Sequence, residues 1–422
     1  MPHSEPQALS LPDVRVPAKW TLGGLAAGLL LGLVLARDGG APGIVAAADW
    51  LGGLWLRGLQ MTIVPLVVAL LVMGIVRTVA AASAGRMAAY SVGQFIAVLA
   101  SGTIFAAFAM PALLRIFPVP ASAAAALSGG AMGGPPPAVP GLLDFLTALV
   151  PTNVIAAASD SAILPLIVFF ALFALAITRL PLEPRLQLSS LFEAIAGAMM
   201  VMIGWVLKLA PIGVFALALA VAAKSGTAAI GALAHYIALV ASIGLVVMAA
   251  GYGLARFGGG IPLGRFARAM LPAQAVALST QSSLASVPAM LGACNRLGLR
   301  QTSGEFVLPL AVAVFRATGP AMNLAVAIYV GHLAGVAMTP PVIAAGVVVA
   351  LLTTLGAPSL PGAISFVSSI GPIALAMGVP LGPLALLVAV EVLPDIVRTV
   401  GNVTLDVAVT ATVDRRAATD RG

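Results

Sequence analysis

Long hydrophobic segments run through almost the whole chain and are separated by short stretches rich in glycine, proline and charge. A segment of about 18 or more apolar residues is typical of a membrane-spanning helix. The pattern therefore predicts an all-α polytopic membrane protein with eight transmembrane helices. Six of these spans precede residue 257, at about residues 20–36, 44–80, 87–117, 141–178, 187–222 and 230–256.

Two apolar segments after residue 256 are broken in the middle by Ser, Thr, Gly and Pro. The first, 264–298, breaks at Ser279–Pro288, and the second, 341–378, breaks at Thr353–Gly362. Each half has roughly 10–14 residues, which is too short to cross a hydrocarbon core of about 30 Å. We therefore predict two re-entrant helical hairpins that enter the membrane from opposite sides.

Two further spans complete the predicted core at residues 257–413. Span 7 covers 305–336 and is interrupted at Phe315–Pro320, and span 8 covers 381–413. Backbone that leaves a helix at membrane depth persists only where it is buried in protein or lines a cavity. Broken segments in corresponding positions are the best sequence indication of a transporter's binding site.

The last span carries a stripe of polar residues on one side of an otherwise apolar helix. At 100° per residue, these residues fall within an arc of about 100°. A charge at the bilayer centre costs at least about 2.5–3.5 kcal/mol, so the stripe must face protein or a water-filled cavity. Its charges indicate a site for a charged solute or ion. The stripe consists of Glu391, Asp395, Arg398, Thr399, Asn402 and Asp406.

Asp395 and Arg398 lie one helical turn apart and can hold both ends of a zwitterion. The Asp395 carboxylate takes an ammonium group, and the Arg398 guanidinium takes a carboxylate through two hydrogen bonds. Asn402 and Asp406 offer oxygen ligands for a cation. In the alternative interpretation, Asp395 and Arg398 only neutralise each other and help the helix to pack.

Polar groups at the breaks form a second set of candidates. Ser282 and Ser283 lie where a short helix begins or ends, and hydroxyls with free backbone N–H groups there bind carboxylate. The second tip, Gly356–Gly362, has glycines and prolines that expose backbone. Arg316 interrupts span 7 and offsets the excess of acids on the stripe. Alternatively, the serines are ordinary helix caps and Arg316 reaches toward the membrane surface.

The composition supports a membrane location and excludes other classes. The chain is 61% hydrophobic and 8% charged, whereas a soluble domain has about 25% charged residues. Its net charge of +7 comes from basic residues spread singly between apolar runs. The positive-inside rule explains that distribution better than nucleic-acid binding does. The same rule places both tails, 1–18 and 414–422, in the cytoplasm and the chain in the cytoplasmic (inner) membrane.

A cofactor or a catalytic site has little support in the sequence. With one cysteine, Cys294, the chain has no internal disulfide and no cysteine-built metal site. Its three histidines show no ligand spacing, and no lysine follows a glycine as in a P-loop. We therefore expect no cofactor and no enzyme activity. A membrane hydrolase or acyltransferase stays as an alternative, although no histidine lies near Ser282 or Ser283 in the sequence.

The polar stripe and several other stretches resemble the dicarboxylate/amino acid:cation symporter family, the glutamate-transporter-like proteins. The resemblance covers about residues 20–413 and includes STQSSLASVP, GAPSLPG, KLAPIGVFAL, PTNVIAAA and QMTIVPLV. The family's last-helix pattern is D-x-x-R-T-x-x-N-x-T-x-D. It is met by Asp395, Arg398, Thr399, Asn402, Thr404 and Asp406.

The resemblance implies a glutamate-transporter-like elevator fold of eight transmembrane helices and two opposed hairpins with inverted repeats. Spans 1, 2, 4 and 5 of residues 19–256 would form a scaffold. Spans 3 and 6 would join residues 257–413 in a transport domain that moves against the scaffold. The implied assembly is a homotrimer in the lipid bilayer.

The same resemblance implies that a small anionic solute is held between the hairpin tips and the last helix. Asp395 would bind the amino group of the substrate and Arg398 its side-chain carboxylate. The main-chain carboxylate would lie against the first tip and the backbone around Leu360. Asn402 and Asp406 would be ligands of a possible sodium ion. The implied substrate-binding residues are Ser282, Ser283, Leu360, Asp395, Arg398, Thr399 and Asn402.

The chain departs from the family at its cation sites. Where the family's seventh helix has N-M-D-G-T, this chain has FRATGP, and a Thr-Ser pair of the third helix falls on Val98 and Leu99. We hypothesise that Arg316 replaces a sodium ion and pairs with Asp406 or another acid of the stripe. Coupling would then be reduced, absent, or based on a proton through Glu391 or Asp406.

The sequence thus predicts a secondary active transporter of small anionic solutes, with acidic amino acids first and C4-dicarboxylates second. One alternative is a C4-dicarboxylate or neutral amino-acid exchanger without sodium coupling. Another is an anion channel, in which the same stripe would line a water path.

Overall fold

A computed structural model of the chain describes residues 18–37, 41–83, 85–119, 147, 149–160, 162–356 and 369–419. Within these residues every regular element is a helix. Seven helical stretches there are long and apolar enough to cross a membrane. They correspond to predicted spans 1, 2, 3, 5, 6, 7 and 8, and predicted span 4 contains a shorter apolar helix at Ile163–Ile177.

The helices keep the order of the predicted segments. Up to residue 257 they are α1 (Ala18–Arg37), α2 (Pro42–Gln60), α3 (Ile63–Ala82), α4 (Arg86–Ile116), α7 (Val154–Ser159), α8 (Ile163–Ile177), α9 (Leu182–Lys208), α10 (Ala210–Ser225) and α11 (Ala228–Phe257). After it come α12 (Leu263–Thr280), α13 (Val287–Leu297), α14 (Gln301–Val314), α15 (Gly319–Leu333), α16 (Pro340–Gly356), α18 (Gly371–Ala376), α19 (Gly382–Leu387) and α20 (Val392–Thr419).

Three segments that we predicted as single helices are in fact interrupted. Segment 44–80 divides into α2 and α3, 187–222 divides into α9 and α10, and the described part of 141–178 contains α7 and α8. In each interrupted segment, the second helix has a proline among its first three residues. These prolines are Pro65 in α3, Pro211 in α10 and Pro165 in α8. Proline lacks the N–H that would continue the preceding helix, but its fixed φ suits a first helical turn.

The breaks predicted in the first hairpin and in span 7 are present. α12 ends at Thr280 and α13 begins at Val287, while α14 ends at Val314 and α15 begins at Gly319. Residues 357–368, which contain most of the second predicted tip, lie outside the described residues. The predicted last span is also interrupted, because α19 ends at Leu387 and α20 begins at Val392.

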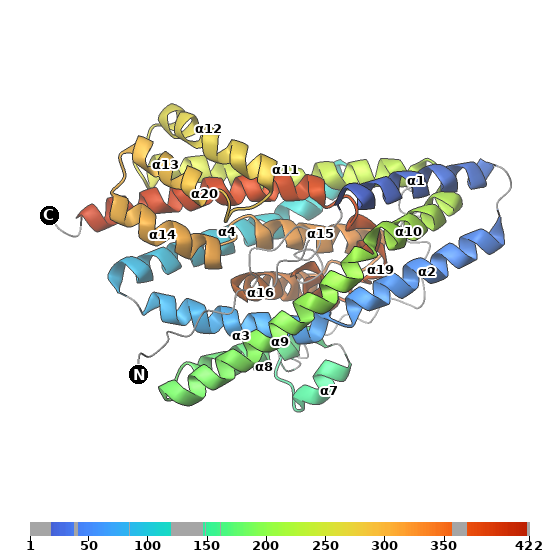
Figure 1. Ribbon diagram of the computed structural model, residues 1–422, viewed down its shortest axis with the longest axis horizontal. Coiled ribbons are helices and arrows are strands. Elements are labelled where there is room, and N and C mark those ends of the chain that lie inside the picture. Colours follow the sequence, from blue (N-terminus) through green and yellow to red (C-terminus); the bar gives the residue numbers. More distant parts are fainter. Residues whose placement is uncertain are drawn as a thin grey trace, which may run out of the picture.

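Two groups of helices occupy different parts of the molecule. α1, α2 and α10 pack together at one end of its long axis (Figure 1). α11 and α20 run side by side along that axis, and α12, α13 and α14 pack against α20. α15 packs against α4, and α3 contacts α8, α9 and α16.

The contact between α1 and α10 is made by glycines. A Cβ atom on Gly32 would lie 2.5 Å from the carbonyl oxygen of Leu219. A Cβ on Gly24 or Gly28 would overlap the carbonyl oxygens of Pro211 and Phe215 in the same way. Small residues let two membrane helices approach until their backbones touch, and van der Waals packing then holds them together.

Candidate functional site

The predicted polar stripe of α20 is buried. Arg398 is 2% exposed and Glu391 is 1% exposed, and the other members of the stripe are buried as well. α20 reaches this burial by packing against α11, α12 and α14. The prediction that the stripe faces protein is therefore confirmed. On the same helix, the apolar Leu393 is 50% exposed.

Arg398 is the centre of a buried cluster of charges. Its Nη1 atom lies 2.8 Å from Oδ1 of Asp395 and donates a hydrogen bond to it. The same nitrogen lies 2.6 Å from Oε1 of Glu391, an ion pair whose geometry is not that of a hydrogen bond. Tyr236 of α11 donates its hydroxyl to the other Glu391 oxygen at 3.2 Å. Two carboxylates thus hold one end of the guanidinium.

The other edge of the Arg398 guanidinium has no hydrogen-bond acceptor in the part of the chain that the structure describes. Nε and Nη2 are both buried, and neither has a partner there. These two nitrogens belong to the planar fork of donors that matches a carboxylate. Leaving a buried donor unpaired costs about 1–3 kcal/mol, and each such group in a native structure needs an explanation. The arrangement fits a site that receives an anionic ligand.

Thr318 fastens the break between α14 and α15 to α20. Its backbone N–H donates to Oδ1 of Asn402 at 2.9 Å. Its hydroxyl lies 2.8 Å from the same Asn402 oxygen and 2.9 Å from the backbone oxygen of Arg398, and it donates to one of them at a time. A Cβ on Gly401 would lie 2.5 Å from Cγ2 of Thr318, so the close approach requires this glycine.

Arg316 lies in the same break and is half-buried. Its charge interacts with those of Asp395 and Arg398. Asp406 is eight positions after Arg398 on α20, about 12 Å along the helix axis. Asp406 is 1% exposed, and neither of its carboxylate oxygens has a hydrogen-bond partner among the described residues. We expected Arg316 to pair with Asp406 or with another acid of the stripe, and Asp395 is the acid whose charge interacts with that of Arg316.

The hydroxyls of Ser282 and Thr399 make local hydrogen bonds. Ser282 Oγ accepts from the backbone N–H of Ala285 at 3.2 Å, within the hairpin tip. The hydroxyl of Thr399 donates to the backbone oxygen of Asp395 at 2.9 Å, within α20. Ser283 is half-buried beside Ser282, and Leu360 lies outside the described residues. The structure thus brings together the α20 residues and the α14–α15 break, while the second tip is not described.

Three polar groups that fix the stripe in place were not predicted from the sequence. Thr318 and Tyr236 are fully buried. Gln274 of α12 donates to the hydroxyl of Thr404 on α20 and to that of Tyr252 on α11, each at 2.9 Å. A single hydroxyl or amide in an apolar segment gives no sign in the sequence of what it contacts. Only the FRATGP break pointed toward Thr318.

The chain is similar to known transport proteins. A family model described as "Sodium:dicarboxylate symporter family" matches residues 18–416. The chain is 26% identical over 374 residues to the proton/glutamate-aspartate symporter of Escherichia coli (strain K12), covering 84% of each chain. It is 26% identical over 391 residues to the proton/sodium-glutamate symport protein of Bacillus subtilis (strain 168), covering 89% of this chain and 88% of the relative.

A third relative carries a different substrate in its name. The chain is 26% identical over 381 residues to the C4-dicarboxylate transport protein of Solibacter usitatus (strain Ellin6076), covering 88% of this chain and 85% of the relative. These three relatives are named as transporters of small anionic solutes, and none of the three is named as an enzyme.

Proposed function

Because the chain belongs to the sodium:dicarboxylate symporter family, we propose that it is a symporter that moves acidic amino acids or C4-dicarboxylates across the cytoplasmic membrane. It is a multi-pass membrane protein and a secondary transporter, not an enzyme. The three relatives described above are named for glutamate, aspartate or C4-dicarboxylates. Each of these solutes has two carboxylates, whereas a neutral amino acid has one.

One observation supports this function most strongly, namely the edge of the Arg398 guanidinium that meets no acceptor among the described residues. A carboxylate that meets Nε and Nη2 together forms two charge-assisted hydrogen bonds in one plane. The acids Glu391 and Asp395 on Nη1 hold the guanidinium in position before the ligand arrives. Asp395 is also the acid that would receive the ammonium group of an amino acid. We therefore rank acidic amino acids above dicarboxylates.

The other predicted contacts complete this binding proposal. Ser282 and Ser283 at the first tip, and the backbone around Leu360 at the second, would bind the main-chain carboxylate. Thr399 and Asn402 would add hydrogen bonds from α20. In this arrangement the solute lies between the two hairpins and α20, out of contact with lipid.

We further propose that the coupling ion is a proton on Asp406. A sodium ion needs several oxygen ligands, as other hard cations do. The amide oxygen of Asn402 is already used by Thr318, and Val98 and Leu99 offer no side-chain oxygen. A proton needs only one carboxylate oxygen, and it removes the cost of several kcal/mol of burying an unpaired charge. Glu391 is the second candidate for this role.

Arg316 would replace the positive charge of the missing cation. Glu391 and Asp395 contribute two negative charges near the site, and Arg316 and Arg398 contribute two positive ones. The cluster is then neutral without sodium. Since Arg316 interacts with Asp395, Asp395 is its partner in this proposal, in place of Asp406.

The movement would be that of an elevator in a homotrimer with both termini in the cytoplasm. Spans 1, 2, 4 and 5 would form the scaffold, and spans 3 and 6 would move with the hairpins and spans 7 and 8. The packing supports this division, since α1 and α2 pack with α10 while α11 packs with α20. Cross-linking an engineered cysteine pair between α10 and α19, which contact each other, should block transport if these units slide past each other.

The deciding experiment is uptake of radiolabelled aspartate by the purified protein in liposomes under a sodium gradient, a proton gradient or neither. Accumulation driven by protons alone supports the proposed coupling, and accumulation driven by sodium contradicts it. Asp406→Asn should abolish accumulation but keep aspartate exchange, because the asparagine resembles the protonated acid. If aspartate is not carried under any gradient but succinate is, dicarboxylates become the substrate.

Two variants separate the roles of the charged residues. Asp395→Asn should weaken aspartate uptake more than succinate uptake, because only aspartate has an ammonium group. Equal loss of both would exclude the ammonium role. Arg316→Ala should alter the ion dependence of uptake, and transport with unchanged ion dependence would contradict the replacement of sodium by Arg316.

A further inference from the structure

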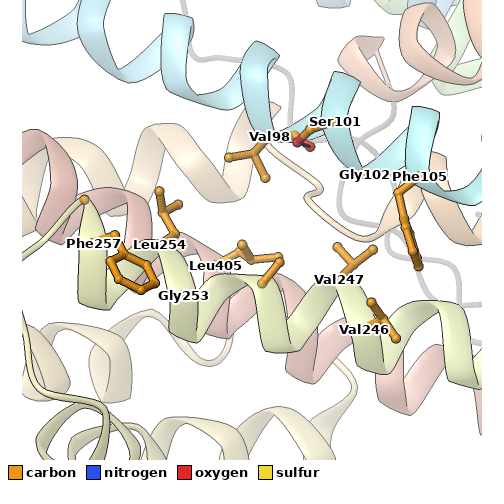
Figure 2. Close-up of a pocket in the computed structure, with 12 residues that line it drawn as sticks. Val98, Ser101, Gly102, Phe105, Val246, Val247, Gly253, Leu254, Phe257 and Leu405 are labelled. Carbon is orange, nitrogen blue, oxygen red and sulfur yellow. Dashed lines mark hydrogen bonds between the residues drawn. The ribbon is translucent and has the colours of Figure 1, made fainter.

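An apolar groove lies between α4 and α11, away from the Arg398 cluster. Its volume is 480 Å³. Figure 2 shows Val98 and Phe105 of α4 facing Leu254 and Val246 of α11, with Leu405 of α20 between the two helices. Among the described lining residues only Ser101 has a polar side chain, and its hydroxyl donates to the backbone oxygen of Val98 at 3.1 Å. The groove is therefore poorly suited to a hydrophilic solute.

The groove opens on an exposed surface of membrane-spanning helices. Phe105 is 37% exposed, Val246 49% and Phe257 83%. Val246 and Phe257 are eleven positions apart on α11, which is about 16 Å along the helix axis. That length is about half of a hydrocarbon core of about 30 Å. The groove thus has the length of an acyl chain from one leaflet.

Arginines lie at the Phe257 end of the groove. Nη1 of Arg415 donates to the backbone oxygens of Phe257 at 3.3 Å and of Gly258 at 3.4 Å, and both residues line the groove. The guanidinium of Arg416 lies 4.7 Å from the ring centre of Tyr90 on α4. Both side chains are exposed, as is that of Arg256 at the end of α11. Positive charge therefore lies where α11 and the apolar groove end.

We propose that this groove binds one anionic phospholipid. Its acyl chain would lie between α4 and α11, and its phosphate would be held by Arg415 and Arg416. Guanidinium groups form charge-assisted hydrogen bonds with phosphate, and basic residues at a membrane surface attract anionic lipids. The acyl chain would rest on Leu405, which precedes Asp406 in the sequence. A bound lipid would therefore contact the helix that carries the polar stripe.

Native mass spectrometry of the purified full chain tests this proposal, with phosphatidylglycerol and phosphatidylcholine of equal chain length as probes. Gly253→Phe fills the groove, because no described atom lies within 4 Å of a Cβ built at Gly253. Gly231→Phe is the matched control, since it lies on the same helix, is not part of the groove lining and has the same open space. Arg415→Gln with Arg416→Gln removes the headgroup charges, and Arg179→Gln with Arg185→Gln is its control.

We expect phosphatidylglycerol to bind the unaltered protein more tightly than phosphatidylcholine. Gly253→Phe should reduce binding of both lipids, whereas Gly231→Phe should not. The Arg415/Arg416 variant should weaken phosphatidylglycerol binding about tenfold or more and phosphatidylcholine binding less, because the choline ammonium of phosphatidylcholine offsets the charge of its phosphate. Because these arginines are exposed, that variant tests the proposal even if the groove variant does not fold.

Three results would overturn the proposal. The first is equal binding of the two lipids to the unaltered protein. The second is an equal loss of binding in the groove variant and its control, or in the two arginine double variants. The third is a change of oligomeric mass in Gly253→Phe with lipid binding retained, because the groove would then be covered by a second copy of the chain.

Discussion

The contact between α1 and α10 and the contact between the α14–α15 break and α20 are both close, but they are built from different groups. In the first, Gly24, Gly28 and Gly32 bring one helix against the backbone and methyl groups of another. In the second, Thr318 bonds to Asn402 and to the backbone of Arg398 in the middle of a buried ion cluster. Close packing stabilises the first contact, and hydrogen bonds stabilise the second.

This difference separates structural support from ligand binding. Membrane helices gain no hydrophobic energy by leaving lipid, so small residues and close packing are a sufficient way to join two of them. Buried charges cost free energy and are retained mainly where they serve a ligand or an ion. Within the described residues, the Arg398 cluster has an unpaired edge, which a contact made by glycines cannot offer. Four substitutions test whether the two contacts differ in this way.

Removing the Arg398 guanidinium should have the largest effect. Arg398→Ala deletes the carboxylate-binding edge and leaves Glu391 and Asp395 without their partner, a change that costs about 3–5 kcal/mol in buried pairs. We expect uptake of aspartate and succinate in liposomes to fall by at least about 100-fold.

Two further variants control for charge and for folding. Arg398→Lys keeps the positive charge without the planar edge and should also fail to bind substrate tightly. Arg398→Ala combined with Glu391→Gln restores the charge balance of the cluster and so should recover stability but not uptake. Aspartate uptake by Arg398→Ala with unchanged KM would show that Arg398 is only a packing residue.

A methyl group in the glycine contact should lower stability rather than substrate affinity. The Cβ of Gly28→Ala would overlap the carbonyl oxygen of Phe215, and such overpacking costs about 1–3 kcal/mol or more. We expect a lower melting temperature in detergent with an unchanged KM for the folded fraction. Gly23→Ala is the control, because no described atom lies within 4 Å of a Cβ there. If Gly28→Ala raised KM without changing the melting temperature, the glycine contact would serve ligand binding rather than structural support.

Removing the Thr318 hydroxyl should have an intermediate effect. Thr318→Val keeps the backbone bond to Asn402 but loses the side-chain bond, at a cost of about 1–2 kcal/mol. We expect both a raised KM and a modest loss of thermal stability, measured on the same preparation. In the control Thr103→Val, the lost hydroxyl bonds to Leu99 within its own helix, so KM should not change. Equal KM in both variants would mean that Thr318 does not position α20.

Removing the Tyr236 hydroxyl should have the smallest effect. Tyr236→Phe deletes the hydrogen bond of 3.2 Å to Glu391. The effect should be small because the lost donor is neutral and Glu391 keeps its contact with Arg398. A loss of about 1 kcal/mol corresponds to a KM raised about fivefold. Tyr252→Phe, which removes the acceptor of a Gln274 bond, should leave KM near the original value. A fall in uptake as large as that of Arg398→Ala would place Tyr236 in contact with substrate.

Prolines show why the fold was only partly predictable. A new helix begins one or two residues before each of Pro65, Pro165 and Pro211, although we predicted a single helix through each of these prolines. Yet a second set of prolines lies inside α4, α12 and α14 without ending them, namely Pro111, Pro272 and Pro309. Proline has no N–H in any of these positions, and in a helix interior this removes one hydrogen bond. Whether the helix then stops depends on what packs against that turn.

The candidate site was predictable to a similar extent. The spacing of Asp395, Arg398 and Asn402 put them on one face, because a helix fixes the angle between positions. The spacing could not show that Asn402 is engaged by Thr318, 84 positions earlier in the chain. Nor could it show that the carboxylate of Asp406 has no hydrogen-bond partner among the described residues, since Asp406 is a single charge in an apolar segment.

The sequence by itself determined that the chain lies in a membrane, where its apolar segments run, and that one face of its last helix is polar. These follow from local rules, because the bilayer requires apolar segments with internal hydrogen bonds and the helix repeats every 3.6 residues. The tertiary structure decided which edge of Arg398 is unpaired among the described residues, what occupies Asn402, and that Asp406 meets no donor there. Such outcomes depend on atoms from distant segments, whose positions are set by packing between helices.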